Sequence, residues 1–431
     1  MFIDFPESHV VVQGIEKIKV PKLAKMRQIY DAEKIEDLGV HVRREMEKTL
    51  KEIPDVREKR LCITAGSRGI PDLALIIRTV CEELKRAGAK PFIIPAMGSH
   101  GGGTAQGQKE YLEGFGITEE SMGVPILSSM EVVKYGELDD GTDLYVDKYA
   151  WESDGIIVLN KVKPHTDFRG RHESGMAKMI AIGLAKHVGA ASFHTRGFAS
   201  FAERIPKVCN VFLEKCPVAF GVAVVQNAYD HISELEIMVP GKIMERDAAL
   251  LEIAKRKVAG FKYPHIDVLV IDEIGKNISG NGHDPNVTGR NNSGLPGFKE
   301  VLDLKKLFIR GLNKETHHNA CGLACADVTT VRCLRDVDWD TTWTNVASCT
   351  QLNGAYIPMY MNNDEDALKL AIKTLNGIDY EKAKVVRIKD TLHMGEIEVS
   401  KSYWEEAKQV EGVELISEFR EISFDEEGYM I

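Results

Sequence analysis

Five side chains in the first half of the chain could do chemistry together, namely Arg68, His100, His165, Lys178 and His194. Imidazoles titrate near neutral pH, so the three histidines can both donate and accept protons under ordinary conditions. The guanidinium offers a carboxylate a planar fork of donors, and the lysine adds a second positive charge. If the fold brings these groups together, they form a site that binds an anion and moves protons.

The neighbours of two of these histidines distinguish them from most others. The chain has 13 histidines, and an isolated histidine is most often a surface or structural residue. His100 lies between Gly98 and a run of three glycines, where a ligand can approach the backbone closely. His165 follows a proline and lies near Lys161 and Lys163. These surroundings favour a ligand-binding role for both residues over a packing role.

Two glycine-rich loops, residues 65–69 and 98–104, precede segments with helical character. Neither loop matches the G-x-G-x-x-G fingerprint of dinucleotide binding or a P-loop, so nicotinamide and ATP binding have weak support. Backbone N–H groups in a loop between a strand and a helix can still hold a phosphate or a carboxylate. The loops therefore predict anion binding rather than a dinucleotide site.

The candidate residues follow apolar segments that predict strands. Residues 61–64, 90–95 and 155–160 are short apolar runs, and residues 71–87 have the apolar spacing of a helix that begins at a proline. The first two strands and this helix predict a right-handed parallel β–α–β unit. Loops that follow parallel strands gather at one edge of the sheet, where ligands bind. We therefore expect the arginine and the first two histidines to share one crevice.

The composition changes near residue 260. A segment rich in glycine and proline precedes a new apolar strand at 266–273, and a long polar loop follows at 275–297. We expect an α/β protein of two domains with the active site in the cleft between them. Residues 1–260 would form a catalytic domain on a parallel-rich, Rossmann-like sheet, and residues 261–431 a smaller α/β domain that caps the substrate.

The charge balance and the apolar runs exclude several classes of protein. The 431 residues include 65 acidic and 55 basic side chains, a net charge of −10, which argues against a nucleic-acid binder. No apolar run reaches the roughly 18 residues that cross a bilayer, and the first residues lack the features of a signal peptide. We expect a cytoplasmic protein that binds neither nucleic acid nor membranes.

The order and spacing of these motifs resemble those of the nickel-pincer lactate racemase family. That family has a short loop ending in Thr/Ser-Arg, a Gly-Thr/Ser-His loop, a Pro-His motif, a Gly-x-x-Lys helix start and a later histidine. The corresponding segments here are Gly66-Ser67-Arg68, Gly98-Ser99-His100, Pro164-His165, Gly175-Met176-Ala177-Lys178 and His194. The resemblance covers most of residues 60–195 and is weaker over residues 260–431.

The resemblance implies a cofactor, a pyridinium-3,5-bisthiocarboxylic acid mononucleotide that holds nickel as a pincer. It implies that Lys178 is the covalent tether and that His194 completes the nickel coordination, a donor set that suits square-planar nickel. Four residues would line the cofactor: Ala65, Gly66, Ser67 and Arg68. The arginine would also reach the substrate. The implied partners are a small anionic hydroxy acid and the enzymes that make and insert the cofactor, and a homo-oligomer stays open.

The reaction that the resemblance implies, inversion of an α-hydroxy acid at C2, fits two of the histidines. The C2–H bond is not acidic enough for easy proton abstraction, so transfer of hydride to an electrophilic cofactor avoids a carbanion. The hydroxyl proton must leave at the same time, and the hydride can return to either face, so each enantiomer needs its own base. We assign these roles to His100 and His165. The expected enzyme is an isomerase, a 2-hydroxyacid racemase or epimerase.

Departures from the family pattern bear on the substrate. Ala65 stands where the family has an acidic residue, and the segment between His165 and Lys178 is slightly longer. The glutamine and lysine that the lactate enzymes carry in the second-domain loop have no clear counterpart, although Lys276 or Arg290 could take over the substrate carboxylate. We therefore expect a substrate larger or more polar than lactate, such as a polyhydroxy or dicarboxylic acid.

Three other functions stay open. A non-nickel oxidoreductase or a hydrolase on the same scaffold would carry neither a mass addition on Lys178 nor nickel. A protein that only binds a hydroxy acid or sugar acid would need the basic residues but not both histidines. A metal or iron–sulfur module could use Cys321, Cys325 and Cys333, although reduced core thiols are the commoner state of such cysteines.

Overall fold

The computed structural model describes residues 1–67 and 69–431, which form two compact units. One unit is Asp31–Val258, and the other combines Met1–Tyr30 with Ala259–Ile431. The division after Val258 lies close to the expected boundary, but the first 30 residues do not belong with the segment that follows them.

Strand pairing explains why the first segment joins the second unit. β1 (Leu23–Gln28) lies between β14 (Glu396–Ser400) and β15 (Val413–Leu415) in one sheet and pairs antiparallel with both. Met26 lies opposite Ile397 of β14 and opposite Leu415 of β15. The expectation that residues 1–260 form one domain is therefore wrong for residues 1–30.

The unit Asp31–Val258 is built on a five-stranded sheet with the order β3-β2-β6-β7-β8. Its first four strands run parallel, and β8 is antiparallel to β7. The strands are β2 (Arg60–Ala65), β3 (Lys90–Pro95), β6 (Gly155–Lys161), β7 (Val218–Gln226) and β8 (Ile232–Met238). The three strands expected from apolar runs are β2, β3 and β6, and the parallel-rich α/β fold is confirmed. Strands buried on both faces need apolar residues at every position, which is why these runs do not alternate.

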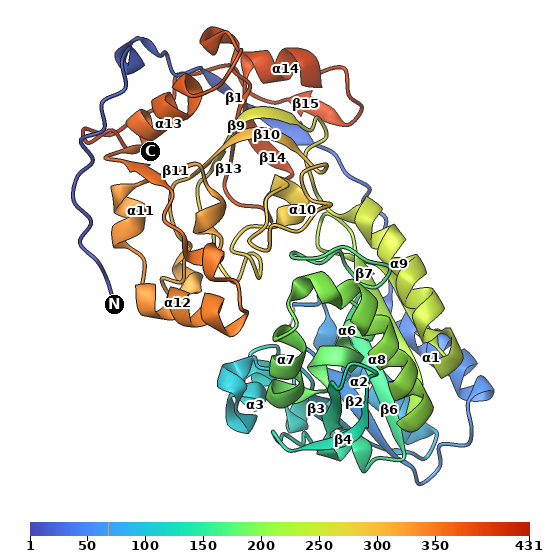
Figure 1. Ribbon diagram of the computed structural model, residues 1–431. Helices are drawn as coiled ribbons and strands as arrows, with labels where there is room; N and C mark the ends of the chain where they lie inside the picture. The colour runs from blue at the N-terminus through green and yellow to red at the C-terminus, as the bar shows by residue number, and fades with distance from the viewer. Residues whose placement is uncertain (68) are drawn as a thin grey trace. The chain divides into compact units, whose positions relative to one another are not determined.

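Helices cover both faces of this sheet (Figure 1). α1 (Leu38–Glu52) and α2 (Leu73–Arg86) pack in one core with alternate strand residues such as Phe220 and Val222. On the opposite face, a Cβ added to Gly221 would lie 2.7 Å from Met176 and 3.0 Å from Ile243 of α9, so small size is required there. The other elements of the unit are α3 (Ala105–Glu113), α4 (Glu119–Met122), β4 (Val132–Glu137), β5 (Asp143–Asp147), α5 (Lys148–Trp151), α6 (Met176–Lys178), α7 (Lys186–His194), α8 (Phe201–Lys215) and α9 (Ile243–Lys257).

The second unit contains an eight-stranded sheet with the order β12-β11-β10-β9-β13-β14-β1-β15. The strands from β12 to β13 run parallel, and the remaining three pairings are antiparallel. The parallel strands are β9 (His265–Ile271), β10 (Asp303–Ile309), β11 (Val328–Thr330), β12 (Met359–Met361) and β13 (Val385–Ile388). The helices are α10 (Pro285–Thr288), α11 (Val331–Arg335), α12 (Trp339–Ser348), α13 (Asp364–Lys373) and α14 (Lys401–Ala407). Within the described residues, no helix has the length and apolar character needed to cross a membrane.

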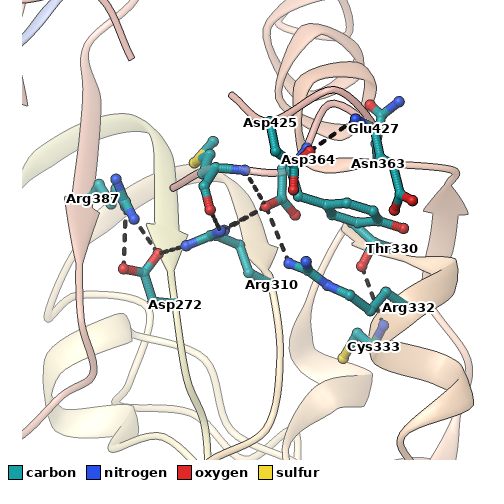
Figure 2. A network of polar contacts seen from close by, with 12 residues as sticks. Asp272, Arg310, Thr330, Arg332, Cys333, Asn363, Asp364, Arg387, Asp425 and Glu427 are labelled. Carbon is teal, nitrogen blue, oxygen red and sulfur yellow. Dashed lines mark hydrogen bonds and ion pairs between the residues drawn. The ribbon is translucent and has the colours of Figure 1, made fainter. Parts of the chain in front are cut away.

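A network of ion pairs lies at the carboxyl end of the parallel strands in the second unit. Figure 2 shows Asp272, which follows β9, between Arg310 and Arg387. The Arg310 guanidinium also donates two hydrogen bonds to the buried Asp364 carboxylate, at 2.9 and 2.7 Å. The backbone of Met430 closes the network, since its N–H donates to Asp364 and its carbonyl accepts from Arg310. These contacts hold the C-terminal residues against the sheet.

Candidate active site

The predicted site loops leave one edge of the five-stranded sheet. In the parallel register, Ala65 at the end of β2 lies opposite Pro95 at the end of β3, and β6 pairs in parallel on the other side of β2. His100 and His165 follow the ends of β3 and β6 within a few residues. The loops that carry the two histidines therefore gather as expected for parallel strands. Arg68, predicted to contact cofactor and substrate, lies outside the described residues.

The loop that carries His100 is a tight turn that requires glycine. Gly101 has φ of +65°, and a Cβ there would lie 2.7 Å from the backbone nitrogen of Gln108. His100 itself is exposed, and its Nδ1 lies 2.5 Å from the Ser67 Oγ. A hydroxyl can donate or accept a hydrogen bond, so this contact is compatible with either tautomer of the imidazole. The Nε2 of His100 can therefore be a proton donor or a proton acceptor.

His165 is held in a more constrained environment. The side chain is buried, its Nδ1 accepts a hydrogen bond from the Asp167 N–H at 3.0 Å, and its Nε2 lies 2.5 Å from the Lys178 Nζ. Because a backbone N–H can only donate, Nδ1 carries no proton in this arrangement and the ring proton is assigned to Nε2. The 2.5 Å contact brings the amine of Lys178, a nucleophile once deprotonated, next to the imidazole.

Aromatic rings surround His194, the last residue of α7. The rings of Phe198 and Phe201 both lie 5.2 Å from the imidazole, and Phe198 also contacts His165. Burial lowers the pKa of His194 to about 4, with a smaller contribution from the positive charge of Lys178. His194 is therefore a neutral imidazole at neutral pH, which is the state that binds a metal ion.

A buried carboxylate fixes the backbone at His165. Glu173 accepts a hydrogen bond from the His165 N–H at 2.8 Å and forms ion pairs with Arg169 and Lys255 at 3.4 and 3.2 Å. The carboxylate is almost fully buried, so these partners compensate for its desolvation. Sequence reasoning missed this role, because Lys255 comes from α9 and no local pattern connects it with the His165 loop.

A second buried carboxylate positions the helix that begins before Lys178. Asp247 of α9 accepts a hydrogen bond from the Met176 N–H at 2.6 Å and lies 3.0 Å from the His172 Nδ1. A Cβ on Gly175 would lie 2.2 Å from the Asp247 Oδ1, so only glycine fits at the helix start. His172, for which the sequence offers no role, orients the carboxylate. The Gly-x-x-Lys spacing thus reflects a close approach between α6 and α9.

Comparison with known proteins adds a family to this geometry. Residues 33–205 match the family model described as the lactate racemase N-terminal domain. This segment of the chain is therefore similar to the lactate racemase N-terminal domain. The structure of the lactate racemase apoprotein from Thermoanaerobacterium thermosaccharolyticum has the same fold, with a TM-score of 0.51 and 16% identity over 86% of this chain and 99% of that chain. No curated protein matches the sequence.

The matched segment contains the described residues predicted to handle protons and the cofactor, but not Lys276 and Arg290. Arg290 pairs with Asp327 at 2.7 Å and donates to the carbonyl of Cys325 at 3.0 Å. Lys276 donates to the carbonyl of Gly280 at 2.6 Å. A substrate role for either residue would require it to exchange these partners, and that role stays a prediction.

Three clustered cysteines, Cys321, Cys325 and Cys333, form no disulfide in the part of the chain that the structure describes. Cys321 and Cys333 are buried, and Cys325 is partly buried. Burial raises the pKa of the Cys333 thiol to about 12, so it stays protonated at neutral pH. Within residues 1–67 and 69–431, no group of three or more His, Cys, Asp or Glu side chains could hold a metal ion.

Proposed function

We propose that the chain is a nickel-pincer-dependent racemase or epimerase that inverts C2 of an α-hydroxy acid by reversible hydride transfer. The observation that carries the proposal is the approach of Lys178 to His165, at 2.5 Å, inside the segment that matches the lactate racemase domain. A lysine amine next to an imidazole is the combination that a covalent tether and a nearby proton carrier require. His100, on the loop after β3, which is separated from β6 by β2 in the sheet, supplies the second imidazole.

The side chains near Lys178 fit the needs of the cofactor. His194, neutral because its pKa is about 4, offers the imidazole nitrogen for nickel. Gly66 lies against Met179, the residue after Lys178, and a Cβ on this glycine would be 3.1 Å from the methionine. The segment Ala65, Gly66 and Ser67 would therefore line the cofactor next to its tether. When bound, the nickel-pincer nucleotide supplies an electrophilic carbon that takes up and returns the hydride of C2.

The two histidines divide the proton transfer between them. The Ser67 hydroxyl adapts to either tautomer, so His100 can take the hydroxyl proton of one enantiomer at Nε2. On the other face, His165 would protonate the keto oxygen from its imidazolium form and return to the neutral ring, in which Nδ1 accepts from the Asp167 N–H. The reverse reaction uses the same groups in the opposite states. Each proton transfer contributes about 10²–10⁴-fold to the rate.

The substrate we propose is an anionic hydroxy acid larger or more polar than lactate. The alanine at position 65 stands where the family pattern has an acidic residue, so one contact of that pattern is missing. Arg68 would hold the carboxylate, with Lys276 or Arg290 as further contacts. The enzymes that synthesise and insert the cofactor would be the macromolecular partners.

The experiment that tests this function follows the C2 hydrogen. The chain, coexpressed with the pincer-synthesis enzymes, would be given single enantiomers of lactate and of several aldonic acids labelled with deuterium at C2. We expect inverted product that retains deuterium, because hydride returns to carbon without exchange with water. Proton abstraction would instead wash deuterium into the solvent, and this result, or no inversion of any acid, contradicts the proposal. Ready inversion of lactate without any aldonic acid would contradict the larger substrate.

Variants of the two histidines sharpen the same experiment. His100→Gln and His165→Gln should each lower kcat by about 10²–10⁴-fold. His265→Gln is the matched control, because His265 is exposed, belongs to the other unit and pairs with Asp303 at 3.1 Å. A protein that only binds hydroxy acids would show no turnover as wild type and unchanged affinity in all three variants.

A further inference from the structure

A fully buried lysine lies behind the loop that carries His100. Lys186, the first residue of α7, has no exposed surface and a left-handed backbone with φ of +53°. Its Nζ donates to the carbonyl oxygen of Pro95 at 2.5 Å and to the Oε1 of Gln108 at 3.2 Å, and it lies 3.0 Å from the Asp147 carboxylate. Two hydrogen bonds and one ion pair thus hold the buried ammonium.

The partners of Lys186 come from separate segments of the unit. Pro95 ends β3, Gln108 belongs to α3, and Asp147 ends β5. The Asp147 carboxylate is fully buried and also accepts hydrogen bonds from the N–H groups of Tyr149 and Ala150. A buried charge is expensive unless it is paired and hydrogen-bonded, so this pairing ties the segments together.

Gln108 connects the buried ammonium of Lys186 with the His100 loop through hydrogen bonds on both sides of its amide. Because its Oε1 accepts from Lys186, the orientation of the amide is fixed and its Nε2 faces the other way. The Nε2 donates to the carbonyl oxygens of Gly98 and His100, at 2.9 and 3.2 Å. Gln108 has no exposed surface, so water does not compete for these bonds. The Gln108 amide therefore holds the backbone of this loop in place through two hydrogen bonds.

We propose that Lys186 and Gln108 are positioning residues that fix the His100 loop relative to helix α7. The proposal rests on the role proposed above for His100. α7 begins at Lys186 and ends at His194, the residue proposed to bind nickel. One buried ammonium thus connects the backbone of the proton-transferring histidine with the helix that carries the nickel ligand.

Gln108→Glu separates positioning from packing. The glutamate keeps the size of the side chain and an acceptor for Lys186, but it loses the Nε2 donor that holds the carbonyls of Gly98 and His100. We expect kcat to fall by about 10- to 100-fold with unchanged cofactor loading, since a small misplacement of a reacting group has effects of this size. Lys109→Met is the matched control on the same helix, because Lys109 only pairs at 3.7 Å with the exposed Glu119.

Hydrogen exchange provides a readout that does not depend on turnover. In the protein purified without cofactor, amides of residues 97–104 should exchange faster in Gln108→Glu than in wild type, while those of β9 in the other unit should not change. Gln108→Met, which removes the donor without adding a charge, should give the same result and replaces the glutamate variant if that variant does not fold. The double variant Lys186→Met/Asp147→Asn, which removes both buried charges, should also loosen this loop.

The two measurements distinguish failure of the positioning role from failure of the proposed reaction. Unchanged exchange of residues 97–104 in all variants, or a kcat within twofold of wild type in Gln108→Glu, overturns the positioning role. Faster exchange of this loop in a protein that has no racemase activity supports the positioning role and overturns the proposed reaction. A uniform rise in exchange across the whole unit would indicate a purely structural role and would also overturn the proposal.

Discussion

His165 is held by three groups with different effects. Asp167 fixes the ring tautomer through its N–H, Lys178 contacts the Nε2 of the ring, and Glu173 accepts a hydrogen bond from the backbone N–H of the histidine itself. The first two contacts decide which state the imidazole starts from, and the third decides where it stands. Removal of the third contact should therefore affect position without changing the ring chemistry.

Glu173→Ala tests this at the scale of one residue. The change leaves a buried N–H at His165 without its acceptor, which costs about 2 kcal/mol of unfolding free energy. It should also lower kcat by about tenfold or more, because the imidazole of His165 is then misplaced. Urea unfolding and steady-state kinetics would measure the two effects.

Glu252→Ala is the matched control for Glu173→Ala. Glu252 pairs with the same Lys255, at 2.9 Å, but its side chain is 63% exposed. An exposed pair contributes about 0–1 kcal/mol, so both stability and kcat should stay near wild type. Equal effects of the two variants would show that the charge of Lys255, rather than the backbone of His165, is what matters.

At the scale of elements, the loop expected at 275–297 is more ordered than its composition suggests. It contains α10, and the fully buried His283 lies 3.0 Å from the Thr288 hydroxyl through its Nδ1. Burial lowers the pKa of His283 to about 4. The segment therefore contributes buried side chains to the core of the second unit.

The buried imidazole predicts a pH dependence of stability. Below its ordinary pKa of about 6.5, His283 gains a proton in the unfolded chain but stays neutral in the folded protein down to about 4. Acidification through this range therefore lowers the free energy of unfolding. Between pH 7 and 5.5 this residue should account for a loss of about 1 kcal/mol.

Urea unfolding of the His283→Leu variant at the two pH values measures this loss. The variant should lack about 1 kcal/mol of the wild-type pH dependence, whatever its absolute stability. His265→Gln, at an exposed position, should keep the wild-type dependence. The same pH dependence in His283→Leu and wild type would show that His283 is not buried in the neutral form.

Some elements could be predicted from the sequence because their signals are local. β2, β3 and β6 are largely unbroken apolar runs. The glycines around His100 predict a tight turn, in which a side chain at Gly101 would clash with the backbone. The supports of the site have no such signal. Asp247 accepts a hydrogen bond from the N–H of Met176, which is 71 residues away in the chain. Lys186 donates to the carbonyl of Pro95, which is 91 residues away. Buried polar partners of this kind depend on tertiary packing, which no spacing rule reveals.

In the whole molecule, the two units have separate cores. One unit is a continuous segment of the chain, and the other combines two separate segments. The core between α1, α2 and the five-stranded sheet consists of residues from 38 to 237 only. The core of the second unit includes Met26 of β1 together with residues such as Ile397 and Val399 of β14. The second unit therefore depends on a segment from the other end of the chain.

This difference predicts how fragments behave. Residues 31–258 should unfold cooperatively on their own, whereas residues 259–431 should not, because removal of β1 leaves β14 and β15 without their shared neighbour. Addition of residues 1–30 through a flexible linker should restore a thermal transition to the second fragment, as measured by far-UV circular dichroism. A transition of 259–431 that is the same with and without residues 1–30 would contradict this.

The net charge of −10 has a consequence for the proposed substrate, which is itself an anion. The average field of the molecule opposes its approach, so attraction must come from basic groups close to the site. Lys161 and Lys163 belong to the segment that carries His165. The chemistry proposed here therefore depends on local charge rather than on the overall field.

The covalent state of Lys178 tests the proposed attachment of the nickel-pincer cofactor most directly. Protein coexpressed with the pincer-synthesis enzymes would be analysed by intact mass, by peptide mapping and by metal content. We predict a mass increment of the size of the cofactor on the peptide that contains Lys178, together with equimolar nickel that is lost in His194→Phe. An unmodified Lys178 and no nickel, under conditions that load a lactate racemase expressed in parallel, would contradict the account.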